Sequence, residues 1–295
     1  FNIIIPLFSN IIRDNIRTNP ISNDKPETIS TSSFYQLENV IVICVEFSNR
    51  PATTNVSEIM NKMTQVEQYY NAVSYGYKNI SAELAVASPS NDTDGDGWYE
   101  IGTYVNSYTT DSYPLIKKAI LAADPDVDFS KYPHIMIVVA GDDYAQSHDP
   151  NDIRSHFRSF AGIGVTIFTE RPIYNACVVA ELDPYGVYAH EFGHSQGLPD
   201  LYDIDTDYVY EEFVYQFSLM AEGSWNGNPP GTQPAGLMGW CRLNLSILDV
   251  SETVPNNTHK VVTLYSLSET NKNALIKIPI TSKVYYLIEL SLIHI

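Results

Sequence analysis

The sequence of 295 residues is poor in cysteine and in basic side chains. Its three cysteines are too few for the disulfide framework of a small secreted domain, although Cys177 and Cys241 could pair in an oxidising compartment. Only 17 lysines and arginines accompany 35 acidic residues, and the formal charge of −18 argues against nucleic acid as a partner because it would repel phosphates. Apolar runs of roughly 18 residues or more are absent, so no transmembrane segment is predicted.

The ends of the sequence look like the ends of a fragment. Residues 1–35 are expected to be an N-terminal arm or the remnant of a pro-segment, because 10–35 are rich in Asn, Ser, Thr, Asp and Pro. The sequence begins at Phe1 rather than Met and stops just after an apolar run, so a signal peptide is expected to be missing. A secreted or extracellular location follows from this interpretation.

Apolar patterns between these ends predict an α+β fold. The continuous β-branched run Val40–Phe47 is typical of a central strand buried on both faces. Apolar residues recur every three or four positions from Ser57 to Tyr75, which predicts a helix capped by Ser57. A second helix is expected at 114–123, and further strands at 80–86, 98–105, 134–140, 165–169 and 176–182.

The order of these elements indicates a catalytic domain with a mixed β-sheet over residues 36–248. Residues 249–295 contain three apolar pieces, HKVVTLYSL, NALIKIPI and KVYYLIEL, which are separated by polar turns and have no helical period. They are expected to be the start of a small, truncated C-terminal β domain.

The strongest local signal is HEFGHSQGLPD, residues 190–200. On a helix His190 and His194 lie on one face and can bind one metal ion, while Glu191 lies beside the metal's water. A catalytic zinc ion takes three protein ligands and keeps a fourth position open. Gly197 can adopt the positive φ that ends the helix and turns the chain back, which places Asp200 as the third ligand.

A glutamate from a following segment is the competing third ligand, and Glu211 and Glu212 are the candidates. Asp200 is preferred because the turn returns it at short range, whereas residues 207–217 are rich in aromatic and β-branched side chains that disfavour a helix. Asp203 either hydrogen-bonds the ligand loop or is a solvated turn residue.

This set of residues predicts a hydrolase. Zinc held by His190, His194 and Asp200 would lower the pKa of its water to about 7, and Glu191 would take the proton and return it to the leaving amine. We therefore expect a zinc-dependent endopeptidase in which the zinc-bound water attacks peptide bonds with Glu191 as general base.

The motif also carries a family resemblance. HEFGHSQGLPDLYD, the later SLM, GSWNG and LMGW segments and the upstream VICVEFSNRPAT, SYGY, DFSKYPHIMIVVAG and NDIRSHFRSF segments resemble the immune inhibitor A family of secreted bacterial and archaeal metallopeptidases, over about residues 38–290. The resemblance implies His190, His194 and Asp200 as zinc ligands and Glu191 as the base.

Because that family is similar to metzincins, it also implies a metzincin-like fold in which Met220 forms an apolar floor below the metal. His156 is placed near the cleft by the same resemblance. Glu222 stands where metzincins often have a tyrosine, so the donor that stabilises the oxyanion is unassigned.

A second constellation is NDTDGDGW, in which Asp92, Asp94 and Asp96 alternate as in the first half of a calcium loop. The twelfth position is Thr103 instead of Glu, so Glu100 or another acid would have to complete the site. The alternative is a polar hairpin turn. Calcium here would be structural and would stiffen the loop.

Two functions compete at this point. The first is a secreted zinc endopeptidase acting on protein or peptide substrates. The alternative is a calcium-stabilised cell-surface binding or adhesion module that retains a metalloprotease fold. The intact set of His190, Glu191, His194 and Asp200 favours the enzyme, because a binding role makes no demand on Glu191.

Overall fold

The apolar run at residues 40–47 lies inside the central sheet of the molecule, as predicted, and all eight side chains are buried. The computed structural model describes residues 36–203, 214–255, 259–269 and 273–291. The strands of the central sheet are β1 (Gln36–Glu46), β2 (Lys78–Leu84), β3 (Tyr99–Glu100), β4 (His134–Val139), β5 (His156–Ser159) and β8 (Asn175–Ala180).

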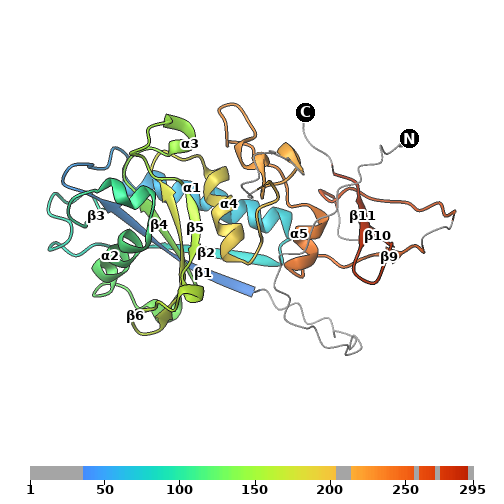
Figure 1. Cartoon of the computed structure of the whole chain (residues 1–295), viewed down its shortest axis with the longest axis horizontal. Coiled ribbons are helices and arrows are strands. Elements are labelled where there is room, and N and C mark those ends of the chain that lie inside the picture. Colours follow the sequence, from blue (N-terminus) through green and yellow to red (C-terminus); the bar gives the residue numbers. More distant parts are fainter. Residues whose placement is uncertain (1–35, 204–213, 256–258, 270–272, 292–295) are drawn as a thin grey trace. The chain divides into compact units, whose positions relative to one another are not determined.

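The sheet is mixed, which confirms the predicted class (Figure 1). Its order is β2-β1-β4-β8-β5, and β3 continues alongside β1 beyond the end of β2. The first four strands are parallel, whereas β5 runs antiparallel to β8 and forms one edge. No apolar run in the sequence indicated β5.

Helices cover both faces of this sheet. Helices α1 (Val56–Val73) and α4 (Tyr185–Ser195) pack with Val40, Val42 and Cys44 of β1 in one core. Helix α2 (Tyr113–Ala123) packs with Ile41, Ile43 and Val45 in the other core. The alternating side chains of β1 thus enter opposite cores, because successive side chains of a strand point to opposite faces.

Several predicted boundaries are corrected by the structure. Helix α1 is capped by Asn55, whose side chain accepts a hydrogen bond from the Glu58 amide, rather than by Ser57. The strand expected at 98–105 is only β3, and the one expected at 165–169 is the short β6 (Ile167–Phe168) of a hairpin with β7 (Pro172–Ile173). All three cysteines are free and buried, so Cys177 and Cys241 do not pair.

The remaining elements are short. They are α3 (Tyr144–Ser147), α5 (Gly239–Asn244), and the 3₁₀ turns η1 (Asn106–Thr109), η2 (Phe129–Lys131), η3 (Ala161–Ile163), η4 (Tyr215–Phe217) and η5 (Glu222–Trp225). Within the described ranges, no helix has both the length and the apolar character needed to cross a membrane.

A second, three-stranded sheet follows the central sheet in the chain. Its strands are β9 (Glu252–Thr253), β10 (Leu275–Pro279) and β11 (Tyr285–Glu289), in the order β11-β10-β9. Two of the three apolar pieces predicted as strands are therefore β10 and β11. The piece HKVVTLYSL forms no strand, and only Ser266 makes an isolated bridge, to Leu290.

Specific hydrogen bonds join the region of this second sheet to the preceding part of the chain. The buried guanidinium of Arg242, on α5, donates to the carbonyl oxygens of Leu237 and Leu267 and lies over the ring of Tyr75. The Tyr75 hydroxyl donates to the same Leu267 oxygen at 2.7 Å. The division into 36–248 and 249–295 stays a prediction, and these contacts cross it.

Candidate metal centre

Helix α4 carries the motif and ends where the sequence predicts. Its last residue is Ser195, and Gly197 follows with φ +95°, a conformation that glycine adopts without strain. The Gly197 amide bonds to the His194 carbonyl at 2.9 Å, and the Leu198 amide bonds to the Gly193 carbonyl at 3.1 Å. This turn reverses the chain and brings Asp200 back to the helix, as predicted.

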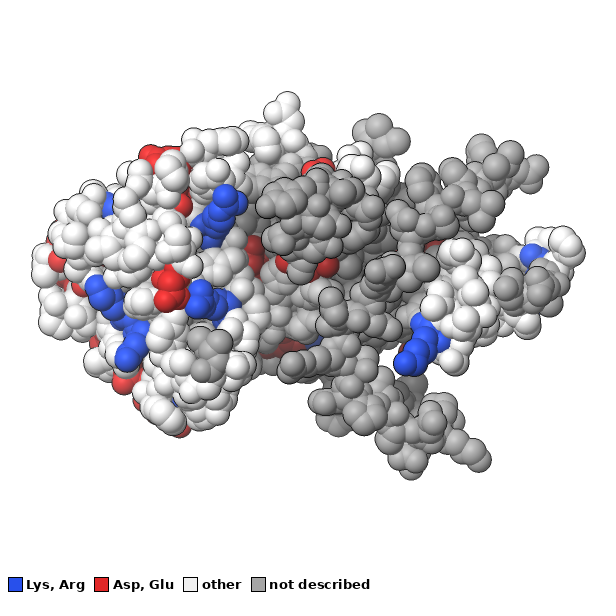
Figure 2. Space-filling model, in the orientation of Figure 1, with Lys and Arg blue, Asp and Glu red and all other residues white. Residues whose placement is uncertain are grey.

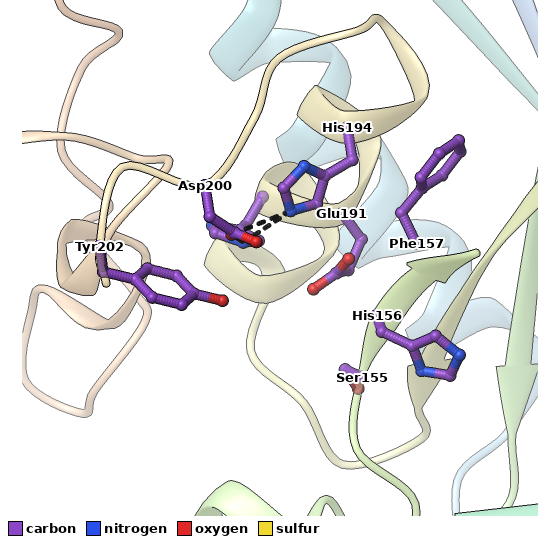
Figure 3. Close-up of a pocket in the computed structure, with 8 residues that line it drawn as sticks. Ser155, His156, Phe157, Glu191, His194, Asp200 and Tyr202 are labelled. Carbon is purple, nitrogen blue, oxygen red and sulfur yellow. Dashed lines mark hydrogen bonds and ion pairs between the residues drawn. The ribbon is translucent and has the colours of Figure 1, made fainter. Parts of the chain in front are cut away.

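The three expected ligand atoms converge on one point (Figure 3). The Nε2 atoms of His190 and His194 are 3.1 Å apart. Oδ1 of Asp200 lies 3.2 Å from the first nitrogen and 3.1 Å from the second. An ion that binds nitrogen and oxygen tetrahedrally at about 2.0–2.1 Å separates these atoms from each other by roughly 3.3 Å. The spacing therefore fits zinc.

The outer nitrogens of the two imidazoles are held by backbone carbonyls. Nδ1 of His190 lies 2.8 Å from the Leu219 oxygen, and Nδ1 of His194 lies 2.7 Å from the Leu198 oxygen. A carbonyl oxygen only accepts hydrogen bonds, so each Nδ1 carries the proton and each Nε2 presents a lone pair to the shared point. This is the orientation that a metal-binding histidine requires.

The electrostatics of the site also fit a cation. Burial raises the pKa of the Asp200 carboxyl, but the close imidazoles of His190 and His194 outweigh this and hold that pKa well below its usual range. The Oδ1 atom is nevertheless buried, and no described group forms a regular hydrogen bond with it. A buried carboxylate oxygen without such a partner is costly unless a cation completes it.

Glu191 lies beside the ligands and is itself buried. Burial raises the pKa of its carboxyl group, and the nearby imidazoles of His190 and His194 only partly offset this. Its Oε2 atom is buried and has no hydrogen-bond partner among the described residues. An uncompensated carboxylate oxygen in a pocket is suited to hold and move a proton.

Met220 packs directly against the helix that carries both histidines. It is fully buried, and a Cβ atom placed on Gly193 would lie 2.5 Å from its Sδ. Its carbonyl accepts a hydrogen bond from the Leu201 amide at 2.7 Å, which ties the Asp200 loop to the Met220 segment. The predicted role of Met220 as the floor of the metal site stays a prediction.

The pocket around the ligands contains residues that sequence reasoning missed. Ser155 and Phe157 come from the β5 segment, and Tyr202 comes from the loop after Asp200 (Figure 3). Ser155 and Phe157 both lie in the NDIRSHFRSF segment, from which only His156 was singled out, because the side chain of an edge strand reaches the site only through the topology of the sheet. Tyr202 stood inside the LPDLYD segment, but its direction was unknown.

His156 lines this pocket, in agreement with its predicted position near the cleft. Its Nδ1 lies 2.6 Å from the Arg154 carbonyl oxygen and its Nε2 lies 2.6 Å from the Ser112 hydroxyl. The first contact places the proton on Nδ1, so Ser112 donates to Nε2. The imidazole is therefore held between the backbone just before β5 and Ser112 at the start of α2.

The other predicted candidates do not join the ligand set. Glu211 and Glu212 lie outside the described residues. Asp203 is half-buried just after the ligand loop, and its predicted support of that loop stays a prediction. Glu222 is exposed on η5.

The aspartates of the NDTDGDGW loop do not converge as a set of three. The Asp92 carboxylate accepts hydrogen bonds from the amides of Gly95, Asp96 and Gly97 and thereby closes a turn. Glu100, the expected additional acid, accepts from Thr93. The acidic groups that approach one another are Asp94, Asp96 and the buried Glu46 at the end of β1.

Comparison with known proteins finds a family match over part of the chain. Residues 134–246, fewer than half of the 295, match the sequence model of the immune inhibitor A peptidase M6 catalytic domain. This segment is therefore similar to that catalytic domain. The match confirms the resemblance and is shorter than the 38–290 span that the sequence suggested.

Relatives and structures are similar to parts of the chain. The pre-pro-metalloprotease PrtV of Vibrio cholerae serotype O1 is 32% identical over 109 residues, which are 33% of this chain and 12% of PrtV. Immune inhibitor A of Bacillus thuringiensis is 50% identical over 50 residues, 17% of this chain and 7% of that protein. The matched segments thus span a small part of both relatives.

The alignments with two solved structures each cover 74% of this chain, at low structural and sequence similarity. Archaemetzincin of Methanopyrus kandleri has a TM-score of 0.36 and 12% identity over 97% of its own chain. OgpA of Akkermansia muciniphila has a TM-score of 0.40 and 18% identity over 62% of its own chain.

Proposed function

We propose that this immune inhibitor A-like chain is the catalytic part of a secreted zinc endopeptidase that hydrolyses peptide bonds of extracellular proteins. The observation that carries the proposal is the convergence of His190, His194 and Asp200 on one tetrahedral point, with the buried Glu191 beside it. A zinc ion at this point supplies Lewis acidity and makes water nucleophilic near neutral pH.

The remaining groups of the site orient the metal ligands and transfer the proton. The carbonyls of Leu219 and Leu198 orient the two imidazoles, and the turn at Gly197 positions the Asp200 carboxylate. Glu191 takes the proton of the attacking water at its unpartnered Oε2 and returns it to the leaving amine. One carboxylate can serve both steps because the two transfers occur at different stages of amide hydrolysis.

The edge of the central sheet favours a peptide substrate. Strand β5 pairs with β8 on one side, and no other described strand pairs with its outer side. Ser155, which precedes this strand, and Phe157, which lies in it, line the same pocket as the metal ligands. An extended peptide can add to such an edge through main-chain hydrogen bonds, which places its carbonyl groups in the pocket.

Hydrolysis of casein by the purified chain tests the proposal. Zinc-loaded protein should be active, a chelator should abolish the activity, and added zinc should restore it. Glu191→Gln should lower kcat by roughly 10²- to 10⁴-fold, the usual contribution of general acid–base catalysis. Glu222→Gln, a change at an exposed glutamate, is the matched control and should retain activity.

Equal activity of the loaded, chelated and Glu191→Gln proteins would refute a zinc-dependent endopeptidase with Glu191 as general base. A protein that is isolated with calcium and takes up no zinc would instead support the alternative of a binding or adhesion module. Calcium binding at the acidic loop and secretion stay predictions.

A further inference from the structure

The edge strand beside the metal pocket begins directly after an arginine and a serine. Arg154 precedes Ser155, His156 and Phe157, which line the pocket, and its side chain is exposed. A peptide that adds to the unpaired edge of β5 would pass close to residue 154. Several lysine and arginine side chains lie over α2 and β5 on the face shown in Figure 2, in a chain whose formal charge is −18. Positive charge beside the cleft is therefore a local feature.

The positive charge of Arg154 is not compensated within the described part of the chain. Arg50 forms an ion pair with Asp152 at 2.8 Å. Arg158, on β5 itself, forms an ion pair with Asp111 at 2.9 Å. The guanidinium of Arg154 makes neither an ion pair nor a hydrogen bond with a described residue, although the acid nearest to it in the sequence is Asp152. It can therefore accept a carboxylate from another molecule.

The side chain of Arg154 is nevertheless held in place. Its Cζ atom lies 3.8 Å from the centre of the Tyr144 ring, which is a cation–π contact. This contact occupies one face of the guanidinium plane and leaves the N–H groups at its edge free to bind a carboxylate through two parallel hydrogen bonds. A side chain that is ordered in advance loses less conformational entropy when a ligand binds.

The backbone around Arg154 is fixed by neighbouring groups. The Arg154 carbonyl accepts a hydrogen bond from Nδ1 of His156 at 2.6 Å. The Ser155 amide donates to the buried carboxylate of Asp143 at 3.1 Å, and the Ser155 hydroxyl donates to the buried carboxylate of Asp183. These two acids lie just before α3 and α4, so the start of the edge strand is tied to both helices. The place of Arg154 beside the pocket is thus set before a substrate binds.

We propose that Arg154 is a specificity-determining residue that binds the carboxylate of an aspartate or glutamate side chain in an extended peptide. The substrate class that it selects is acidic peptides. This assignment rests on the proposed endopeptidase function and deepens it. The net negative charge of the chain repels such peptides at long range, but salt screens that repulsion beyond about 8 Å, whereas the contact with Arg154 is direct.

A peptide scan tests the preference. Peptides blocked at both ends carry glutamate or glutamine at successive positions on both sides of the scissile bond, and mass spectrometry confirms the bond that is cleaved. At one position kcat/KM for the glutamate peptide should exceed that for the glutamine peptide about 5- to 10-fold, as one charge-assisted pair at a partly exposed site provides. Raising the salt concentration from roughly 0.05 to 0.5 M should reduce this ratio. A glutamine peptide with a free C-terminal carboxylate tests the other source of the same charge.

Substitutions of Arg154 separate its charge from its shape. Arg154→Gln should bring the ratio to about 1, and Arg154→Lys, which keeps the charge but loses the planar donors, should give an intermediate value. Arg154→Glu should favour a lysine peptide at the same position. The matched control is Lys118→Gln, because Lys118 is also an exposed cation over a tyrosine ring, 5.7 Å from the centre of Tyr108, but lies on α2 and is absent from the pocket lining. It should leave the ratio unchanged.

Peptide binding measures the same preference without turnover. On the zinc-loaded Glu191→Gln protein, the Kd of the glutamate peptide should lie about 5- to 10-fold below that of the glutamine peptide. Arg154→Gln in the same background should remove this difference. Fluorescence anisotropy of labelled peptides measures both values.

The assignment is overturned if no position gives a ratio above about twofold, if the ratio survives in Arg154→Gln, or if Lys118→Gln lowers it equally. A preference for the free C-terminal carboxylate alone also overturns it, because the ligand would then be a chain end. If the unmodified protein binds peptides but hydrolyses none, the endopeptidase proposal fails, and the binding comparison still decides the role of Arg154.

Discussion

Two segments of this chain have the residue pattern of a metal site. They differ in whether the expected donor atoms are already hydrogen-bonded by the protein. In the HEFGHSQGLPD segment, three side-chain atoms face one point at 3.1–3.2 Å from one another, and the Oδ1 atom of Asp200 is left buried without a regular hydrogen bond. In the NDTDGDGW segment, the Asp92 oxygens are satisfied by three backbone amides of their own turn.

The two segments differ in which lone-pair donor atoms remain available to bind a cation. The histidines are bound through their outer nitrogens, so the inner nitrogens stay available. In the acidic loop, short polar side chains bond to the nearby backbone, which is the usual behaviour of aspartate in turns. A spacing pattern therefore predicts a metal site only when the surrounding backbone leaves the donor atoms unengaged.

Removal of one oxygen donor from each segment should affect zinc binding very differently. Asp200→Asn should weaken zinc binding by about 10²-fold or more, because even the outer partners of metal ligands are typically worth 10- to 100-fold. Asp92→Asn should change zinc affinity by less than about threefold. Titration with a competing chelator measures both, and equal losses would show that the two segments do not differ in this way.

Replacement of one glycine by alanine in each segment compares how tightly the two segments are packed. Gly193→Ala should lower the free energy of unfolding by about 1–3 kcal/mol, because its new Cβ would lie 2.5 Å from Sδ of the buried Met220. At Gly95 a Cβ meets nothing within 4 Å, so Gly95→Ala should cost only about 1 kcal/mol, from its φ of +82°. Urea unfolding of both variants provides the comparison. A larger cost at Gly95 would contradict it.

Calcium should produce the smallest effect. If the cluster of Glu46, Asp94 and Asp96 binds calcium with a Kd of about 1 mM, 10 mM calcium adds roughly 1.4 kcal/mol to the stability. The thermal midpoint should then rise by a few degrees, and Glu46→Gln should remove that rise. If Asp92→Asn removes it and Glu46→Gln does not, the loop pattern expected from the sequence is the correct one.

Short-range features of the site were accessible from the sequence, and long-range features were not. His190, His194 and Asp200 lie within eleven consecutive residues and depend on one helix and one glycine turn. Glu46 lies on a distant strand, and its approach to Asp94 depends on the pairing of β1 with β3. No local pattern contains that pairing.

The prediction of strands and helices was limited in the same way, because local sequence patterns do not contain long-range pairing. The buried run of β1 was recognised because it is apolar at every position, whereas β5 reads SHFRSF around its core and has no such run. HKVVTLYSL has the apolar and β-branched residues of a strand, yet most of it pairs with no described strand, so composition alone did not decide its structure. At the start of α1, Asn55 and Ser57 are both good caps, and only the backbone geometry distinguishes them.

The hydrogen bonds between the two sheet regions limit where the chain can be truncated without loss of stabilising contacts. Removal of everything after Leu248 would leave the buried guanidinium of Arg242 without the Leu267 oxygen and the hydroxyl of Tyr75 without its acceptor. It would also remove Glu289, which accepts from the Gly239 amide at 2.5 Å. The central sheet and the second sheet meet near residue 249, and because these hydrogen bonds cross that point we expect the two parts to unfold together.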